Sequence, residues 1–255
     1  MKNKSRSKKQ ITGRDETVFK IDSNNRGQID MTQFSAKPES KQAKRKNKKR
    51  KNIGSEPYKK EPVGLRIVGG KFRGSRLVYT GNNRVRPMKD RVREAVFNLI
   101  GPAIRGKRAI DLFGGTGALA IEAISRGAVA ATVIEMHLPT AVLLRQNLEA
   151  LNLLNVCQLC KTDAFFWAKN HEMQPNDDIA WIVFCSPPYS FYVEREDELL
   201  EMLRNLINAA PTASVFIIES DNRFDFNKLP IKPNPNKIRS YPPAEIAIFS
   251  KIENF

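Results

Sequence analysis

The sequence predicts an α/β fold in which a mostly parallel, seven-stranded sheet is covered by helices on both faces. Three observations predict it. From residue 108 onward, short apolar runs alternate with segments of helical periodicity. The central runs are almost continuously apolar, as is typical of strands buried on both faces of a parallel sheet. Glycines follow the first of these runs and precede a helical segment, as in folds that bind ligands at the carboxyl ends of their strands.

Charge divides the 255-residue chain into three parts. Residues 1–62 carry a net charge of +12, residues 63–108 a net charge of +10, and residues 109–255 a net charge of −6. The first part is poor in large apolar residues, so we expect a disordered basic tail over 1–62. The positive charge of residues 1–108 fits an acidic substrate or a phosphate backbone as partner. For the tail alone, a solvated segment that aids solubility is the alternative.

The ordered domain is expected to cover residues 63–255 and to open with a basic extension at 63–100. Two β-type runs flank a glycine-rich turn and predict a hairpin. Apolar residues at helical spacing follow, with Asp90 as the expected N-cap of a helix. The expected elements of the extension are strands at 65–70 and 76–79 and a helix at 90–100.

Strands and helices alternate over the rest of the chain, which favours a sheet built from consecutive strand–helix units. The expected strands are 108–113, 130–135, 156–160, 179–184, 213–219, 237–240 and 245–250. The expected helices are 118–126, 139–151, a short one around 165–167, and 194–209.

Three cysteines, an odd and low number, fit a reducing compartment without disulfides. Cys157 and Cys160 have metal-ligand spacing, but they lie in an expected strand where such positions point to opposite faces. We therefore expect no metal. No run reaches the roughly 20 apolar residues that a membrane span needs, and no apolar stretch follows the basic start as in a secretory signal. We expect a cytoplasmic monomer without a membrane partner.

Three of the expected strands end in residues suited to ligand binding. The first ends in the loop 111–117, whose glycines let a ligand approach the backbone. The second ends in Glu135, a carboxylate that can accept hydrogen bonds from ribose hydroxyls. The strand 179–184 is followed by the segment 186–189, Ser-Pro-Pro-Tyr, in which two prolines hold the carbonyls outward beside an aromatic ring. Residues 115–120 also fit a dinucleotide fingerprint, so an NAD site is an alternative.

The loop 111–117 resembles the D-x-F-x-G-S/T-G loop of S-adenosylmethionine-dependent methyltransferases. The segments 66–74 and 86–98 resemble two N-terminal signatures of the RsmD family, whose members methylate the N2 amino group of a guanine in bacterial 16S ribosomal RNA. The resemblance runs from about Leu65 to Lys251. It implies a Rossmann-like methyltransferase fold, the cofactor S-adenosylmethionine, and ribosomal RNA or a small-subunit ribonucleoprotein as partner.

The resemblance also implies roles for the residues that match, and it shows two departures. The (D/N)-P-P-(F/Y) motif reads Ser-Pro-Pro-Tyr at 186–189, and R-P-T reads Arg-Pro-Met at 86–88. The implied RNA-binding residues are Lys71, Arg73 and Arg76, and the implied catalytic residues are Ser186, Pro187 and Tyr189. The implied cofactor-binding residues are Arg86, Pro87, Asp111, Phe113, Gly115, Thr116, Gly117, Glu135, Asp163 and Ala164.

The mechanism implied by the resemblance is mainly one of positioning. The carbonyl of Pro187 and the hydroxyl of Ser186 would accept hydrogen bonds from the target amine, while Tyr189 stacks on the base. Because a hydroxyl is shorter than a carboxylate, we expect slow rather than absent methyl transfer. The alternatives are an RNA-binding relative with impaired catalysis and an N-methyltransferase with another nucleic-acid or protein target. An NAD oxidoreductase would leave Asp111 and the basic half unexplained.

Overall fold

The computed structural model describes residues 64–79, 81, 87–170 and 174–251. The expected basic tail at 1–62 and the expected cofactor residue Arg86 lie outside the described residues. None of the helices within the described ranges has the length and apolar character that crossing a membrane would require.

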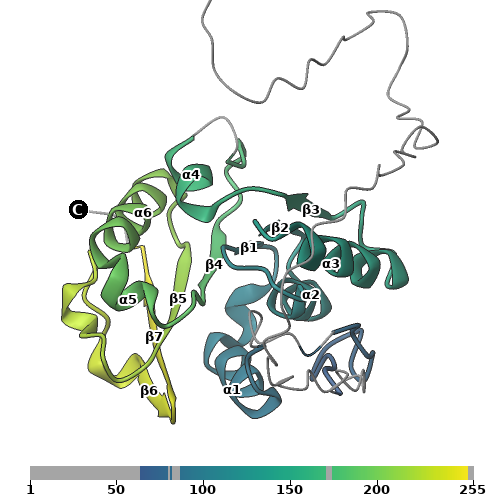
Figure 1. The fold of residues 1–255 in the computed structure, drawn as a ribbon, viewed down its shortest axis with the longest axis horizontal. Helices are drawn as coiled ribbons and strands as arrows, with labels where there is room; N and C mark the ends of the chain where they lie inside the picture. Colours follow the sequence, from purple (N-terminus) through teal and green to yellow (C-terminus); the bar gives the residue numbers. More distant parts are fainter. Residues whose placement is uncertain (1–63, 80, 82–86, 171–173, 252–255) are drawn as a thin grey trace, which may run out of the picture. The chain divides into compact units, whose positions relative to one another are not determined.

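A seven-stranded sheet forms the centre of the domain, in the order β3-β2-β1-β4-β5-β7-β6 (Figure 1). The first five strands are parallel to their neighbours, whereas β7 runs antiparallel to β5 and to β6. The strand order reverses between β1 and β4, where ligands bind in sheets of this kind. The strands are β1 (Arg108–Asp111), β2 (Ala130–Ile134), β3 (Cys157–Cys160), β4 (Trp181–Cys185), β5 (Val215–Ser220), β6 (Ile238–Tyr241) and β7 (Ala244–Ser250).

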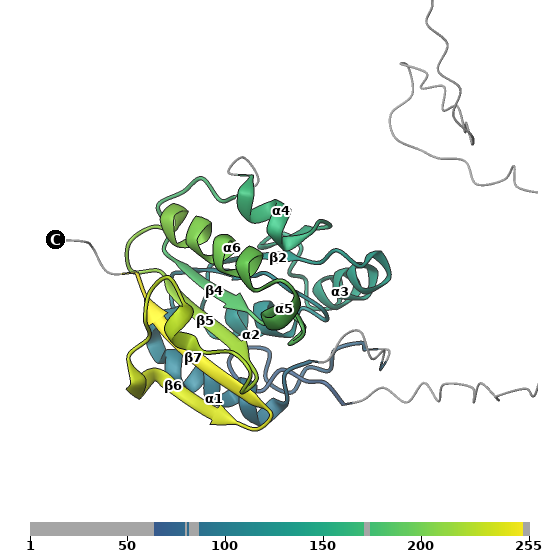
Figure 2. The same cartoon turned by 60° about the vertical axis from the view of Figure 1, so that its left-hand side comes forward.

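Helices cover both faces of this sheet, so the predicted α/β architecture is confirmed (Figure 2). Alternate residues of each central strand enter different cores: in β4, Ile182 packs with residues of α1, α2 and α3, while Val183 packs with residues of α4 and α6. Cys157 and Cys160 likewise lie against opposite cores, as expected from their spacing. The helices are α1 (Asp90–Ile100), α2 (Ala118–Ser125), α3 (Leu138–Ala150), α4 (Ala164–Lys169), α5 (Phe191–Glu194) and α6 (Glu196–Ala209).

The expected helix at 194–209 is confirmed except at its start, because Glu194 ends the short helix α5 and α6 begins at Glu196. Arg195 separates α5 from α6 and leaves the helical conformation at φ −137°. The three residues that open α6 are acidic, and a helix N-terminus favours negative charge. The guanidinium of Arg195 lies 3.9 Å from the ring centroid of Phe165 and 5.1 Å from that of Phe191. The break thus brings Arg195 onto an aromatic cluster.

The expected hairpin is a turn with one antiparallel bridge, between Arg66 and Arg76, and not a pair of regular strands. Backbone hydrogen bonds still cross the hairpin, from the N–H of Ile67 to the carbonyl oxygen of Ser75 at 2.9 Å and from the N–H of Leu77 to that of Leu65 at 2.8 Å. Other backbone groups of the hairpin bond to α2. The N–H of Val68 donates to Glu122 Oε2 at 2.8 Å, and the N–H of Phe72 donates to Ser125 Oγ at 2.8 Å. The hairpin is therefore fixed onto the surface of α2.

The sequence suggested Asp90 as the N-cap of α1, but Asp90 does not cap this helix. The N-cap is Lys89, which makes no side-chain capping bond, and Asp90 is the first helical residue. Its carboxylate pairs instead with Arg66 at 3.1 Å and with Arg93 at 2.9 Å. Arg93 is fully buried and lies 3.8 Å from the equally buried Glu122 of α2. This ion network holds the basic extension against α2 and the sheet.

Candidate functional site

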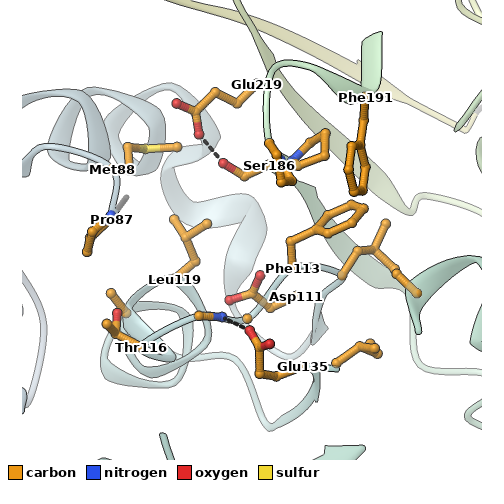
Figure 3. Close-up of a pocket in the computed structure, with 18 of the residues that line it drawn as sticks. Pro87, Met88, Asp111, Phe113, Thr116, Leu119, Glu135, Ser186, Phe191 and Glu219 are labelled. Atoms are coloured by element: carbon orange, nitrogen blue, oxygen red, sulfur yellow. Dashed lines mark hydrogen bonds between the residues drawn. The ribbon is translucent and has the colours of Figure 1, made fainter. Parts of the chain in front are cut away.

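A cavity of about 910 Å³ lies at the carboxyl ends of β1, β2, β4 and β5 (Figure 3). This volume is in the range of small-molecule and cofactor sites. The structure brings most of the expected cofactor and catalytic residues together there. Those that line the cavity are Pro87, Asp111, Phe113, Gly115, Thr116, Glu135, Asp163, Ala164, Ser186, Pro187 and Tyr189.

Gly117, expected beside the cofactor, does not line the cavity. It is the N-cap of α2 in the left-handed conformation, at φ 79°, which favours glycine. Gly114 is needed for packing, because a Cβ there would lie 2.3 Å from Cγ1 of Val133 on β2. Gly114 and Gly117 therefore serve the strand-to-helix turn. Gly114 and Gly115 both line the cavity, whereas Gly117 does not.

Glu135 follows β2, and backbone groups on both sides hold its carboxylate. Oε2 accepts from the N–H of Gly115 at 2.9 Å, and Oε1 accepts from the N–H of His137 at 2.7 Å. Each oxygen keeps lone-pair capacity for a further donor. Glu135 is thus oriented to receive hydroxyl groups in the cavity. His137 also lines the cavity.

Asp111 ends β1 with its side chain facing the cavity, and the residue is only 1% exposed. Neither carboxylate oxygen has a hydrogen-bond partner of normal geometry among the described residues. Burial raises the pKa of Asp111 to about 7, despite the nearby backbone N–H of Ala120, and the charge of Glu135 adds to the rise. A positively charged group in the cavity would offset the cost of ionising this carboxyl.

Asp163 lies between β3 and α4, and its side chain stabilises the start of α4. Its Oδ1 accepts from the backbone N–H groups of Phe165 at 2.9 Å and Phe166 at 3.0 Å, so it caps the helix. The rings of Phe113, Phe165 and Phe191 pack together nearby, with centroids 5.9 to 6.3 Å apart. Phe113 and Phe191 face the cavity and form an aromatic wall.

The Ser-Pro-Pro-Tyr segment lies across the cavity from Glu135, and it meets a residue that sequence reasoning missed. The hydroxyl of Ser186 donates to Oε2 of Glu219 on β5, and the hydroxyl of Tyr189 donates to Oε1 at 2.8 Å. Figure 3 shows the Ser186–Glu219 and Glu135–Gly115 bonds on opposite sides of the cavity, with Asp111 between them. Glu219 could have been suspected as the lone carboxylate near the end of an apolar strand.

The expected RNA-binding residues lie apart from this lining. Lys71, Arg73 and Arg76 are exposed on the hairpin, and none of them lines the cavity. Gly70 allows the hairpin to approach α2, because a Cβ there would lie 2.0 Å from the carbonyl oxygen of Ser125. The three cations are therefore presented by a turn that is held in place.

No cluster of histidine, cysteine or carboxylate side chains suited to a metal ion occurs within the described part of the chain. Cys157 and Cys185 are buried and Cys160 is half-buried, all as free thiols. Burial raises the pKa of the Cys157 thiol to about 12. These thiols are therefore protonated at neutral pH.

Comparisons with known proteins agree with this geometry. The family model described as "Conserved hypothetical protein 95" matches residues 65–242. "Ribosomal RNA small subunit methyltransferase D" of Escherichia coli K12 is 38% identical over 125 residues, which cover 49% of this chain and 60% of the relative. The protein of that name from Buchnera aphidicola subsp. Baizongia pistaciae is 27% identical over 201 residues, covering 77% of this chain and 97% of the relative.

Among solved structures, the chain is similar to the putative methyltransferase yhhF from Escherichia coli. The TM-score is 0.58 at 27% sequence identity, covering 74% of this chain and 98% of the other. The family match spans more than half of the chain, including the hairpin, the glycine loop and the Ser-Pro-Pro-Tyr segment. The chain therefore belongs to the family described as conserved hypothetical protein 95, an RsmD-like methyltransferase family with a Rossmann-like fold.

Proposed function

We propose that this chain transfers a methyl group from S-adenosylmethionine to the exocyclic N2 amino group of a guanine in small-subunit ribosomal RNA. One observation carries the proposal. A single cavity has carboxylates suited to a nucleoside and a cation on one side, and a Ser-Pro-Pro-Tyr segment suited to an amine on the other. The names of the E. coli and Buchnera relatives support ribosomal RNA as the substrate class.

The residues present fit the cofactor. Glu135 would receive the ribose hydroxyls on the oxygens that Gly115 and His137 already orient. Asp111, buried without a partner of normal geometry, would face the positive charge of the methionine part. Asp163 and Ala164 would border the adenine. The cofactor supplies a methyl group on a sulfonium: as the nitrogen–carbon bond forms, sulfur keeps the electron pair of the broken bond and the nitrogen loses a proton to solvent.

The chain's own contribution on the other side is to align the amine. The lone pair of a guanine amino group is delocalised into the ring, so the group must be turned before it can react. The backbone carbonyl of Pro187 and the oxygen of Ser186 would accept its two hydrogens and direct the lone pair toward the methyl carbon. Tyr189 would border the base that is brought out of its helix.

RNA would dock on the basic extension. Lys71, Arg73 and Arg76 stand exposed on a turn that α2 fixes, so they can contact phosphates at a constant position relative to the cavity. Phosphate contacts of this kind set register and orientation, and base contacts in the cavity would set specificity. The tail 1–62 would add charge that does not depend on sequence.

The proposal is tested with small-subunit particles and naked small-subunit RNA from a strain that lacks this gene. The purified chain and labelled S-adenosylmethionine are added, and the RNA is digested to nucleosides for mass spectrometry. We expect one new N2-methylguanosine per RNA. Label in another nucleoside, or in a ribosomal protein, would contradict the proposal.

The replacement of a carboxylate or carboxamide by Ser186 favours a second candidate, an RNA-binding relative with impaired catalysis. Tight binding of the particle without methyl transfer under saturating cofactor would support this candidate over the first.

A further inference from the structure

Glu219 is a buried carboxylate that the implied mechanism does not use. The residue is 7% exposed, its strand is otherwise apolar up to Ser220, and its side chain reaches the cavity. It forms no salt bridge with any residue in the part of the chain that the structure describes. Its two oxygens instead accept from two hydroxyls, those of Ser186 and Tyr189. Burying a charge is costly unless it is hydrogen-bonded. The two hydroxyls reduce this cost for Glu219, and we therefore ask what the carboxylate does for Ser186 and Tyr189.

The register of the sheet brings these residues together. β4 and β5 are parallel, with Cys185 beside Ile218. The next residues along the two strands are Ser186 and Glu219, so the two side chains leave neighbouring strands at the same level. A second bond fixes the backbone here, because the hydroxyl of Tyr192 donates to the carbonyl oxygen of Glu219 at 2.7 Å. The backbone is thus anchored independently of the carboxylate.

The bond to Glu219 determines what the Ser186 hydroxyl can offer a substrate. A hydroxyl has one proton and two acceptor lone pairs. Since the proton of Ser186 is directed to Glu219, its lone pairs remain for an N–H donor in the cavity. A hydroxyl free to rotate could donate to the amine instead and occupy the lone pair that must react. A charged acceptor also strengthens the bond and polarises the serine oxygen.

We propose that Glu219 and Ser186 together replace the single Asp or Asn side chain of the family motif. Glu219 is a positioning residue: it keeps Ser186 as a hydrogen-bond acceptor for the target amino group and holds Tyr189 beside it. The inference rests on the proposed function, since it assigns the means by which the same site aligns the amine.

The test is a single-turnover measurement of methyl transfer to small-subunit particles at saturating cofactor. We expect Ser186→Ala and Glu219→Ala each to slow transfer about a hundredfold, with S-adenosylhomocysteine affinity and melting temperature close to those of the wild type. Because the two residues act as one unit, the double variant should be no slower than the slower single variant. Glu219→Gln keeps the shape of the side chain, so its rate of methyl transfer should lie between those of Glu219→Ala and the wild type.

Rescue separates a positioning role from a merely structural one. The amide oxygen of asparagine is an acceptor that cannot donate, so it needs no carboxylate to set its polarity. Ser186→Asn in the Glu219→Ala background should therefore recover at least tenfold in rate. Glu245→Ala is the matched control: Glu245 lies on the adjacent strand β7, paired with Ser220, and does not line the cavity. It should leave the rate unchanged.

The outcomes of these experiments distinguish the proposed methyl transfer from the proposed role of Glu219. If the wild type transfers no methyl group, the proposed function fails, and this inference fails with it. If the wild type is active but the single losses multiply in the double variant, or Ser186→Asn gives no rescue, the function stands and the role of Glu219 is wrong. Glu219 variants that keep the wild-type rate would also overturn the inference.

Discussion

The two sides of the cavity are built in different ways. On the cofactor side, one strand–loop–helix unit and the end of the next strand supply the polar groups, and the carboxylate of Glu135 is held by backbone N–H groups. On the acceptor side, side chains from β4 and β5 hold one another, as Ser186 and Glu219 do. The first kind of site leaves a contiguous motif in the sequence. The second depends on strand order, so a substitution at one position can be matched by a partner 33 residues away.

The largest effect is expected on the cofactor side. Glu135→Ala removes the acceptor for the ribose hydroxyls and leaves the N–H groups of Gly115 and His137 without their partner. We expect S-adenosylhomocysteine affinity, measured by calorimetry, to fall at least a hundredfold. Glu149→Ala, at an exposed pair with Arg145 on α3, is the control. Retained affinity in Glu135→Ala, or tight binding of NADH instead, would contradict this assignment.

Asp111 predicts that cofactor affinity depends on pH. Its raised pKa of about 7 means that the carboxyl is protonated below that pH and ionised above it. Because the ionised form attracts a cation, affinity for S-adenosylmethionine should increase as pH rises from 6 to 8, by up to about tenfold per unit below the pKa. By the same linkage, the ligand-free protein should become more stable as pH falls from about 7 toward 4. Asp111→Asn should flatten both profiles; a slope that survives this variant would assign the titration to another group.

The contrast between the two sides of the cavity also explains how much of the fold and of the site could be predicted from the sequence. Apolar runs and glycines locate β1, the loop after it and Glu135, because all of their signals are local. The pairing of Ser186 with Glu219 could not be predicted, since it requires knowing that β4 and β5 are neighbours. The hairpin was predicted, because its turn signal is local, but its attachment to α2 was not. The break at Arg195 was missed for the same reason as that attachment: the stacking of Arg195 on Phe165 is a tertiary contact that overrides local periodicity.

RNA binding should depend on residues that lie outside the cavity. Lys71→Ala, Arg73→Ala and Arg76→Ala should each lower the slope of log K against log salt by about 1, with cofactor affinity unchanged. Deleting residues 1–62 should flatten the slope further without changing the methylated nucleotide. If that deletion leaves the slope unchanged, the tail serves solubility only. If it changes the target nucleotide, the tail takes part in recognition.

The smallest effect is expected for Ser186→Asn in an otherwise wild-type chain. Ser186 considered alone predicts a slow enzyme that this change would accelerate. With Glu219 already fixing the serine as an acceptor, we expect the single-turnover rate to change by less than about fivefold. A rise of a hundredfold would show that serine is a poor acceptor even with its partner.

On this account, one side of the cavity binds the cofactor and the other aligns the amine. Ser186→Ala tests this most directly, with two quantities measured on the same preparation. These are the dissociation constant of S-adenosylhomocysteine and the single-turnover rate of methyl transfer at saturating cofactor. We predict an unchanged dissociation constant and a rate about a hundredfold lower. A weakened dissociation constant with a wild-type rate at saturation would contradict this account, because Ser186 would then belong to cofactor binding and not to alignment of the amine.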